Sequence, residues 1–267
     1  MIAWVSKRAA PLAALAMGAA LSGCGMNYNS WDEVEGVPLA ELDMSGDAPD
    51  TIRLAGPDKV VITEGDTLTI TLDGDEEAGA ALRFDRDGSR LSIARDREIY
   101  DGRDDAIVRV TMPAPANLEI AGSGEIESDT LASTGELEIA GSGSISVANV
   151  DAESLEVDIA GSGDVTAAGT ARKLEVDIAG SGDVDLRALT ADEVKIGIAG
   201  SGNVQLSSNG TVDANIAGSG DINVTGSATC SVTTAGSGSL TCRNDATTAA
   251  ATSEETEAEA EEGAAEE

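Results

Sequence analysis

Carboxylate side chains recur through the middle of the sequence at intervals of 19 or 20 residues. One series comprises Glu119, Glu138, Asp158 and Asp177, and a second comprises Glu136, Glu156 and Glu175 and is interrupted by Lys195. Carboxylate oxygens are preferred ligands of Ca²⁺, so a stack of them would form a weak ladder of divalent-cation sites. The simpler interpretation, which we favour, is a solvated acidic face, so no metal site is assigned. We treat the first series as weak metal candidates and expect no cofactor beyond weakly bound Ca²⁺.

Other residues offer little chemistry for catalysis. The chain contains no His, which removes the commonest general base and the commonest transition-metal ligand. Aromatic residues make up 2% of the sequence, too few to stack against sugars. The recurring Gly-Ser-Gly-Asp phrase resembles Ca²⁺-binding rolls, but Ser144 and Asn203 take the place of the Asp in other copies. We therefore expect no enzyme activity and assign no catalytic residue.

Cys24 is the candidate for covalent modification. Lys7 and Arg8 precede an apolar stretch at 11–21 that is too short to span a bilayer as a mature helix. The segment ends in Leu-Ser-Gly-Cys, which resembles a bacterial lipobox, where the Cys is acylated and becomes the first mature residue. The alternative is an ordinary secretory peptide with a chance Cys. We predict a signal peptide at 1–23, lipidation at Cys24 and a linker at 24–36.

A sequence repeat predicts the strands that position these carboxylates. The phrase Ala-Gly-Ser-Gly recurs every 18 to 20 residues, with its Ala at positions 121, 140, 160, 179, 199, 217 and 235. The flanking residues alternate between apolar and polar with a period of two, which indicates strands. A repeat of this length indicates a solenoid. We predict an all-β, single-stranded parallel β-helix with about 18–20 residues per coil, in which each coil is strand, Gly-Ser-Gly corner, strand and a variable return.

Two further cysteines fall in the last coil. Cys230 follows the inward column of Leu155 and Leu174, and Cys242 follows the inward column of Leu186 and Leu206. Both would point into the coil from opposite sides of its corner. An oxidising compartment favours a Cys230–Cys242 disulfide, whereas two small buried apolar residues are the alternative.

The segments that flank the regular repeats have a different character. Residues 37–113 are strand-rich but irregular, and we expect them to form capping coils of one solenoid that covers 37–245, with regular coils at 114–245. Strands are expected at 51–54, 59–62, 67–72, 90–94 and 106–112. Residues 246–267 contain eight Glu and no basic residue, and we predict a disordered acidic tail.

The chain resembles a known bacterial family. The apolar strands before Thr111-Met112-Pro113 are followed by repeats of Leu-x-Ile-x-Gly-Ser-Gly-x-Ile, and both features are similar to the head GIN domain family. The resemblance covers roughly 39–242 and implies a parallel β-helix. The family's usual label, "putative auto-transporter adhesin", implies an adhesin-like role.

These observations favour a cell-envelope lipoprotein that presents a rigid anionic surface. The formal charge of −33 excludes a nucleic-acid partner, because phosphate contacts need clustered Lys and Arg. The residue after Cys24 is Gly25 and not Asp. By resemblance to bacterial sorting rules, this favours location at the outer membrane. The protein could then face either the periplasm or the exterior. The expected partners are the membrane, through the lipid anchor, and an envelope or surface protein or glycan. The alternative is an envelope polysaccharide-binding or -processing β-helix protein.

Overall fold

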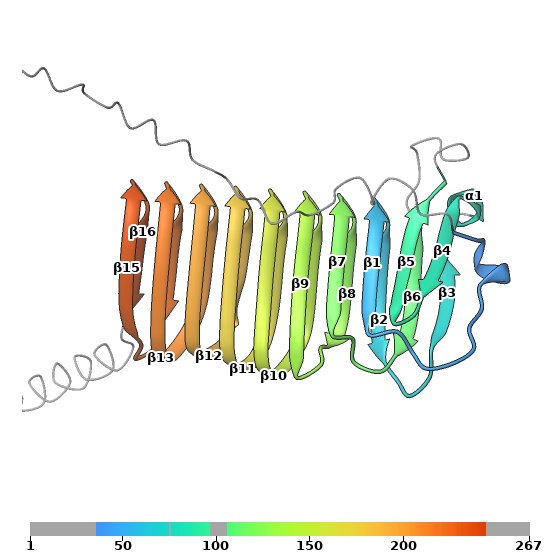
Figure 1. Cartoon of the computed structure of the whole chain (residues 1–267), viewed down its shortest axis with the longest axis horizontal. Helices are drawn as coiled ribbons and strands as arrows, with labels where there is room; N and C mark the ends of the chain where they lie inside the picture. Colours follow the sequence, from blue (N-terminus) through green and yellow to red (C-terminus); the bar gives the residue numbers. More distant parts are fainter. Residues whose placement is uncertain (1–35, 75, 97–105, 244–267) are drawn as a thin grey trace, which may run out of the picture.

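The protein is a parallel β-solenoid, as the computed structural model of residues 36–74, 76–96 and 106–243 shows (Figure 1). The strands form one 16-stranded sheet that winds into successive coils. This confirms the predicted all-β fold. The predicted signal peptide, the linker with Cys24 and the acidic tail lie outside the described residues. The regular strands are β7 (Asn117–Gly122), β8 (Glu125–Thr130), β9 (Thr134–Gly141), β10 (Ser144–Gly161), β11 (Asp164–Gly180), β12 (Asp183–Gly200), β13 (Asn203–Gly218), β14 (Asp221–Thr225), β15 (Thr229–Gly236) and β16 (Ser239–Arg243).

Neighbouring coils stack in the register that the repeat predicts. Ala160 of β10 lies opposite Ala140 of β9 and Ala179 of β11. The expected return loop is absent in β10 to β13, because each of these strands runs without interruption from one Gly-Ser-Gly corner to the next. The bend opposite the corner is made by register shifts within the strands, such as the one between Val147 and Val150. A bulge bends a strand while the pairing continues on both sides of it.

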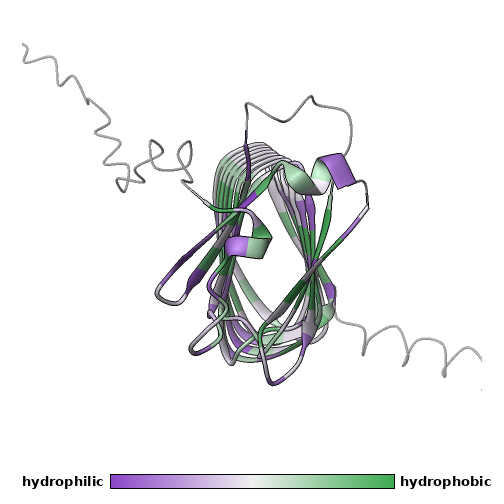
Figure 2. Cartoon of the chain, turned by 90° about the vertical axis from the view of Figure 1, so that its right-hand side faces the viewer, coloured by the Kyte–Doolittle hydropathy of each residue, from purple (hydrophilic) through white to green (hydrophobic). Residues whose placement is uncertain are grey.

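The core is a set of columns of branched side chains between the two walls of each coil. Ile159, Ile178 and Ile198 are each 2% exposed, and the alternate residues along the same strands face outward. Figure 2, which views the molecule end-on, shows the coils superposed as a flattened oval. Each coil therefore has two outer walls, and every second residue of a strand contributes to one of them.

The Gly-Ser-Gly corner requires glycine for two reasons, and Gly180 illustrates both. Its φ of 144° lies in the region that L-residues rarely adopt. A Cβ at Gly180 would also collide with the carbonyl oxygen of Gly161 in the coil below. The following Ser181 donates its backbone N–H to that same oxygen over 2.8 Å. The repeated phrase is therefore an architectural corner.

The N-terminal coils do not follow the order of the chain. The strand β1 (Thr51–Gly56) lies between β7 and β5 (Arg90–Arg95), and β2 (Lys59–Glu64) lies between β8 and β6 (Ile107–Met112). The coil built from β1 and β2 is thus inserted between later segments. The sequence predicted these four strands but not their spatial order.

Antiparallel strands close the N-terminal end of the stack. The strand β3 (Thr69–Asp73) pairs with β6, and β4 (Leu82–Asp87) pairs with β5. Short helical turns, η2 (Leu39–Glu41) and α1 (Glu76–Ala80), lie at the same end. Phe84 of β4 is fully buried and covers the core. This confirms a cap, although β4 and both helical turns were missed at the level of sequence.

Candidate interaction surface

The recurring carboxylates form a continuous ladder on one outer wall. Glu119 lies opposite Glu138 in register, Glu138 opposite Asp158, and Asp158 opposite Asp177. We call these four residues the acidic ladder. A parallel row on the same wall contains Glu136, Glu156 and Glu175, and continues to Lys195. The wall therefore carries closely spaced charges of one sign over four successive coils.

Arginines close the N-terminal end of the acidic ladder. Arg53 of β1 lies opposite Glu119, with its Nε atom 3.9 Å from a carboxylate oxygen of that residue. A terminal nitrogen of Arg90 lies 3.6 Å from the other oxygen. The side chains of Arg53 and Glu119 are 13% and 14% exposed. The cap thus neutralises the first carboxylate, and the remaining three lie beyond these ion pairs.

The protein environment disfavours the ionised form of Glu138, Asp158 and Asp177 in the acidic ladder. Burial raises the pKa of Asp158 from its ordinary value to about 7, and the like charges of Glu156 and Asp177 add to this effect. Burial, followed by the charge of Glu119, also raises the pKa of Glu138. Burial raises the pKa of Asp177 as well. A cation that approached this wall would relieve the repulsion.

A shallow apolar trough runs beside the acidic ladder. Its volume is about 530 Å³, and its floor contains the outward Ala of successive corners. We call it the alanine trough. Ala is the smallest side chain with a Cβ, so a column of alanines leaves a depression next to longer neighbours. The lining residues include Glu138, Asp158, Ala160, Asp177, Ala179, Gly197, Ala199, Asn215, Ala217, Thr233 and Ala235.

The alanine trough was not predicted from the sequence, because its residues belong to the architectural repeat. The Ala before each Gly-Ser-Gly corner marked the coil period and drew no functional interpretation. The available signal was that this outward position stays Ala in all seven copies. The trough and the acidic ladder therefore occupy adjacent columns of one wall, two residues apart along each strand.

The four weak metal candidates are placed one per coil. Within the described parts of the chain, no group of three or more acidic, His or Cys side chains has the arrangement of a metal site. Ca²⁺ requires six to eight oxygen ligands, more than two stacked carboxylates supply. The geometry of the acidic ladder thus fits a diffuse cation-attracting face better than a discrete Ca²⁺ centre.

The two cysteines of the last coil form a disulfide. Cys230 of β15 and Cys242 of β16 are bonded, with their Cα atoms 6.7 Å apart. Cys230 lies opposite Val212 and Cys242 opposite Val224, as their predicted columns require. Cys230 is half-buried and Cys242 is exposed, because no further described coil covers them. The alternative of two buried thiols is therefore wrong.

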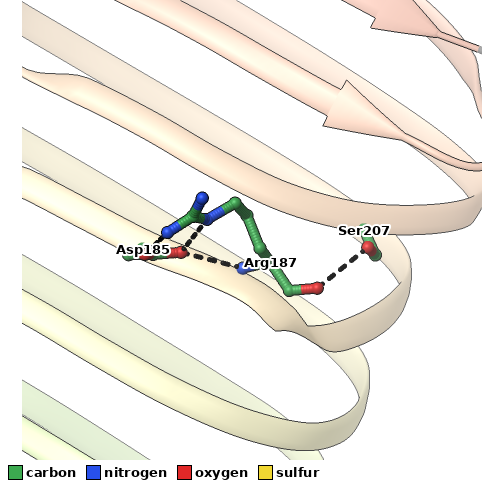
Figure 3. A network of polar contacts seen from close by, with 3 residues as sticks. All are labelled: Asp185, Arg187 and Ser207. Carbon is green, nitrogen blue, oxygen red and sulfur yellow. Dashed lines mark hydrogen bonds and ion pairs between the residues drawn. The ribbon is translucent and has the colours of Figure 1, made fainter.

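A polar network occupies the bend on the other side of the coil. The carboxylate of Asp185 accepts hydrogen bonds from the Nε and the backbone N–H of Arg187, over 2.8 and 3.2 Å (Figure 3). Ser207 in the next coil donates to the carbonyl oxygen of Arg187 over 3.1 Å. These bonds lie at the register shift between Leu186 and Thr190. Their position gives them a structural role at the bend, away from the acidic ladder.

Comparison with protein families identifies the family of this chain. The family model described as "Putative auto-transporter adhesin, head GIN domain" matches residues 48–228. The chain belongs to this family. The match includes the cap strands from β1 onward, all the regular coils to β14 and the complete acidic ladder. It ends just before β15, so the disulfide-bonded last coil lies beyond it. No curated protein sequence matches the chain significantly.

Several solved structures of bacterial proteins share the fold. A putative adhesin from Bacteroides fragilis superposes with a TM-score of 0.69 at 20% identity, covering 73% of this chain and 93% of that one. A "putative lipid binding protein" from Parabacteroides distasonis gives a TM-score of 0.61 at 22% identity, covering 74% and 94%. A putative adhesin from Parabacteroides merdae gives 0.59 at 20% identity, covering 74% and 93%. At these identities the likeness concerns the fold.

The described part of this head GIN protein contains no helix that is both long and apolar enough to cross a bilayer.

Proposed function

We propose that this head GIN protein is a lipid-anchored component of the bacterial cell envelope with an adhesin-like, non-catalytic role. Its contact surface is the wall that carries the acidic ladder and the alanine trough. The observation that supports this proposal is the adjacency of the two features on a rigid set of coils. The lipid on Cys24 would hold the solenoid at the outer membrane, and the linker at 24–36 would separate it from the bilayer.

The chemistry of the wall favours a cationic partner with an extended shape. A bound cation would stabilise the ionised form of the carboxylates with raised pKa values, because its attraction offsets the repulsion from their neighbours. The trough is long and shallow, so it accommodates a chain better than a compact molecule. Because the coils are rigid, little conformational entropy is lost from this side of the interface on binding. The proposed partner is therefore a basic, extended segment of an envelope or surface protein.

A binding experiment with a charge-matched control tests this proposal. The probe is a fluorescent oligolysine peptide of about ten residues, titrated by fluorescence anisotropy at low ionic strength. The test variant combines Glu138→Gln, Asp158→Asn and Asp177→Asn. The control combines Asp164→Asn, Asp183→Asn and Asp221→Asn, which removes the same charge from the opposite wall. The control is needed because any chain of charge −33 attracts a polycation.

The expected outcome is a selective loss. Three ion pairs of about 0.5–1 kcal/mol each predict an affinity at least roughly tenfold lower for the test variant. The control should stay within about twofold of the wild type. Equal losses in both variants would mean that the acidic ladder has no special role and would overturn the cationic-partner proposal.

A second candidate ligand is suggested by the apolar lining of the alanine trough. One structural relative is described as a "putative lipid binding protein", and an extended acyl chain would fit an apolar trough. Replacing Ala179 by Tyr would block the trough, while Thr166→Tyr places the same ring on the opposite wall. Loss of binding to detergent-dispersed fatty acid in the first variant alone would favour the acyl chain. Binding to a glycan array that depends on Ala179 would favour the polysaccharide alternative.

A further inference from the structure

The two ends of the solenoid are closed to different extents. At the N-terminal end, β3 and β4 pair antiparallel to the outermost coil (Figure 1). Phe84 of β4 is fully buried there as part of the core. At the C-terminal end, β15 pairs with β13 and β16 pairs with β14, and no further described strand follows. Within the described residues, the backbone edge of the last coil is therefore left open.

The core side chains of this last coil are less completely covered than those of the coil below. Ala214 in β13 is fully buried, whereas Val232, which lies opposite it in β15, is 44% exposed. Leu240 is partly buried, while Ile222 opposite it is fully buried. The exposed atoms are thus those that another coil would cover. This end presents unpaired strand edges and apolar side chains together.

The last coil also lacks the usual protection of an edge. Proteins discourage edge-to-edge pairing with charged side chains, proline or bulges on their outer strands. Residues 229–243 contain no Asp, Glu, Lys or Pro, and their single charge is Arg243. Both strands pair with the coil below without a register shift. The residues of this coil therefore contribute almost no charge repulsion of their own between two copies, although the whole chain carries a net charge of −33.

We propose that the coil formed by β15 and β16 is a docking edge for the same coil of a second copy of this chain. A two-fold axis perpendicular to the solenoid axis lays β15 antiparallel to β15 of the partner copy, and β16 antiparallel to its counterpart. When this axis runs from one wall to the other, each wall of one copy meets the same wall of the second copy, so both strand pairs form in one interface and cover Val232 and Leu240. Such an interface is closed and self-complementary, and it ends at two copies.

The sequence that follows β16 sets the conditions for this docking. Residues 244–267 carry nine acidic residues and no basic one. Because β16 ends at Arg243 in the docking coil, a dimer joined there brings two copies of this acidic sequence to one interface, and their repulsion would oppose association. Salt screens this repulsion over a Debye length of about 10 Å at 0.1 M. Association is therefore expected to strengthen as ionic strength rises, and to need less salt when the acidic segment is neutralised.

Sedimentation velocity over a range of NaCl and protein concentrations tests the proposal. All samples are the full chain with Cys24→Ser, which removes any lipid. The wild type should shift from monomer to dimer as NaCl rises from about 0.02 to 1 M. A variant with all eight Glu of 254–267 replaced by Gln should dimerise at least about tenfold more tightly at low salt.

Two single substitutions identify the surface. Val232→Lys places a charge in the open end and should abolish the dimer. Ser231→Lys is the matched control, because this adjacent residue faces the outer wall away from the alanine trough, and it should leave the dimer intact. Circular dichroism verifies that both variants retain the fold. A neutralised-tail variant that stays monomeric at about 100 µM and 1 M NaCl, or a dimer insensitive to Val232→Lys, would overturn the proposal.

Discussion

At the scale of single residues, the acidic ladder links the stability of the fold to pH. The pKa of Asp158 is raised to about 7 in the folded protein, above the ordinary value near 4 of an unfolded chain. The folded state therefore binds this proton more tightly than the unfolded state does. The resulting stabilisation is complete below about pH 4 and is lost as the pH rises through 7.

We predict that Asp158→Asn stabilises the protein at pH 8 and has little effect at pH 4. The substitution removes the repulsion and desolvation that the carboxylate suffers at high pH. Because the side chain is half-exposed and solvent screens the charge, we expect about 1 kcal/mol, or a rise of about 2–4 °C in Tm. Thermal melts from pH 4 to 8 measure this, with Asp164→Asn on the opposite wall as the control. A Tm difference independent of pH would contradict the assignment.

The corner glycines are the residues least tolerant of change. Gly180→Ala forces a Cβ into a positive φ and against the carbonyl of Gly161. We expect a loss of about 2–4 kcal/mol in the free energy of unfolding, measured by urea denaturation. Ser181→Ala, one residue away on the exposed corner, should cost less than about 0.5 kcal/mol. Similar losses in both variants would show that the corner is not sterically limited.

At the scale of elements, the sequence predicted both the pairing of the regular coils and the presence of a cap, but not how the strands of the cap pair. In the regular part, each strand pairs with the strand one period away, so the spacing of Ala160 and Ala179 contains the register. In the cap, β1 pairs with β5 and with β7, which follow it at two different separations along the sequence. No repeat in the sequence indicates these pairings. The strand β4 was missed because Leu82 and Phe84 are its only apolar residues among charged ones.

The same distinction applies to the candidate site. The positions of the acidic ladder followed from the period, because outward residues alternate with inward ones along each strand. The raised pKa of Asp158 depends on burial between neighbouring side chains, which spacing alone does not reveal. The alanine trough emerges only when columns of different side-chain length lie next to each other on a wall.

The last coil depends on its disulfide. A bond between residues 12 apart closes a short loop and should contribute about 3 kcal/mol by restricting the unfolded chain. Cys242 is exposed, so a reductant reaches the bond in the folded protein. We predict that reduction, or Cys230→Ser with Cys242→Ser, makes the chain sensitive to protease near Thr241 while the preceding coils stay intact. Equal proteolysis rates before and after reduction would contradict this.

At the scale of the whole molecule, net charge opposes the compact state. Like charges on neighbouring coils repel, and added salt screens them. We predict that NaCl raises the Tm, and that CaCl₂ at equal ionic strength raises it by about the same amount. Differential scanning calorimetry measures both. A much larger effect of millimolar Ca²⁺ would reveal specific sites and restore the metal interpretation of the acidic ladder.

The location of the molecule is a separate prediction that depends on Cys24. If this residue carries the lipid, the wild type should fractionate with the outer membrane. Cys24→Ala should release soluble or unprocessed protein. Membrane fractionation followed by immunoblotting measures the distribution, and Ser22→Ala serves as a control that retains a small residue before the Cys. Unchanged membrane retention of Cys24→Ala would rule out the lipid anchor.

The insertion of the β1–β2 coil between later segments has a consequence for the order of folding. A regular coil needs only the preceding coil to be present, so the repeats assemble by local steps as the chain lengthens. The strand β1 is made early but lies between β5 and β7, and it has no complete site until both have been synthesised. We therefore expect the part of the solenoid that emerges first from the ribosome to be completed only after later segments have taken their places around it.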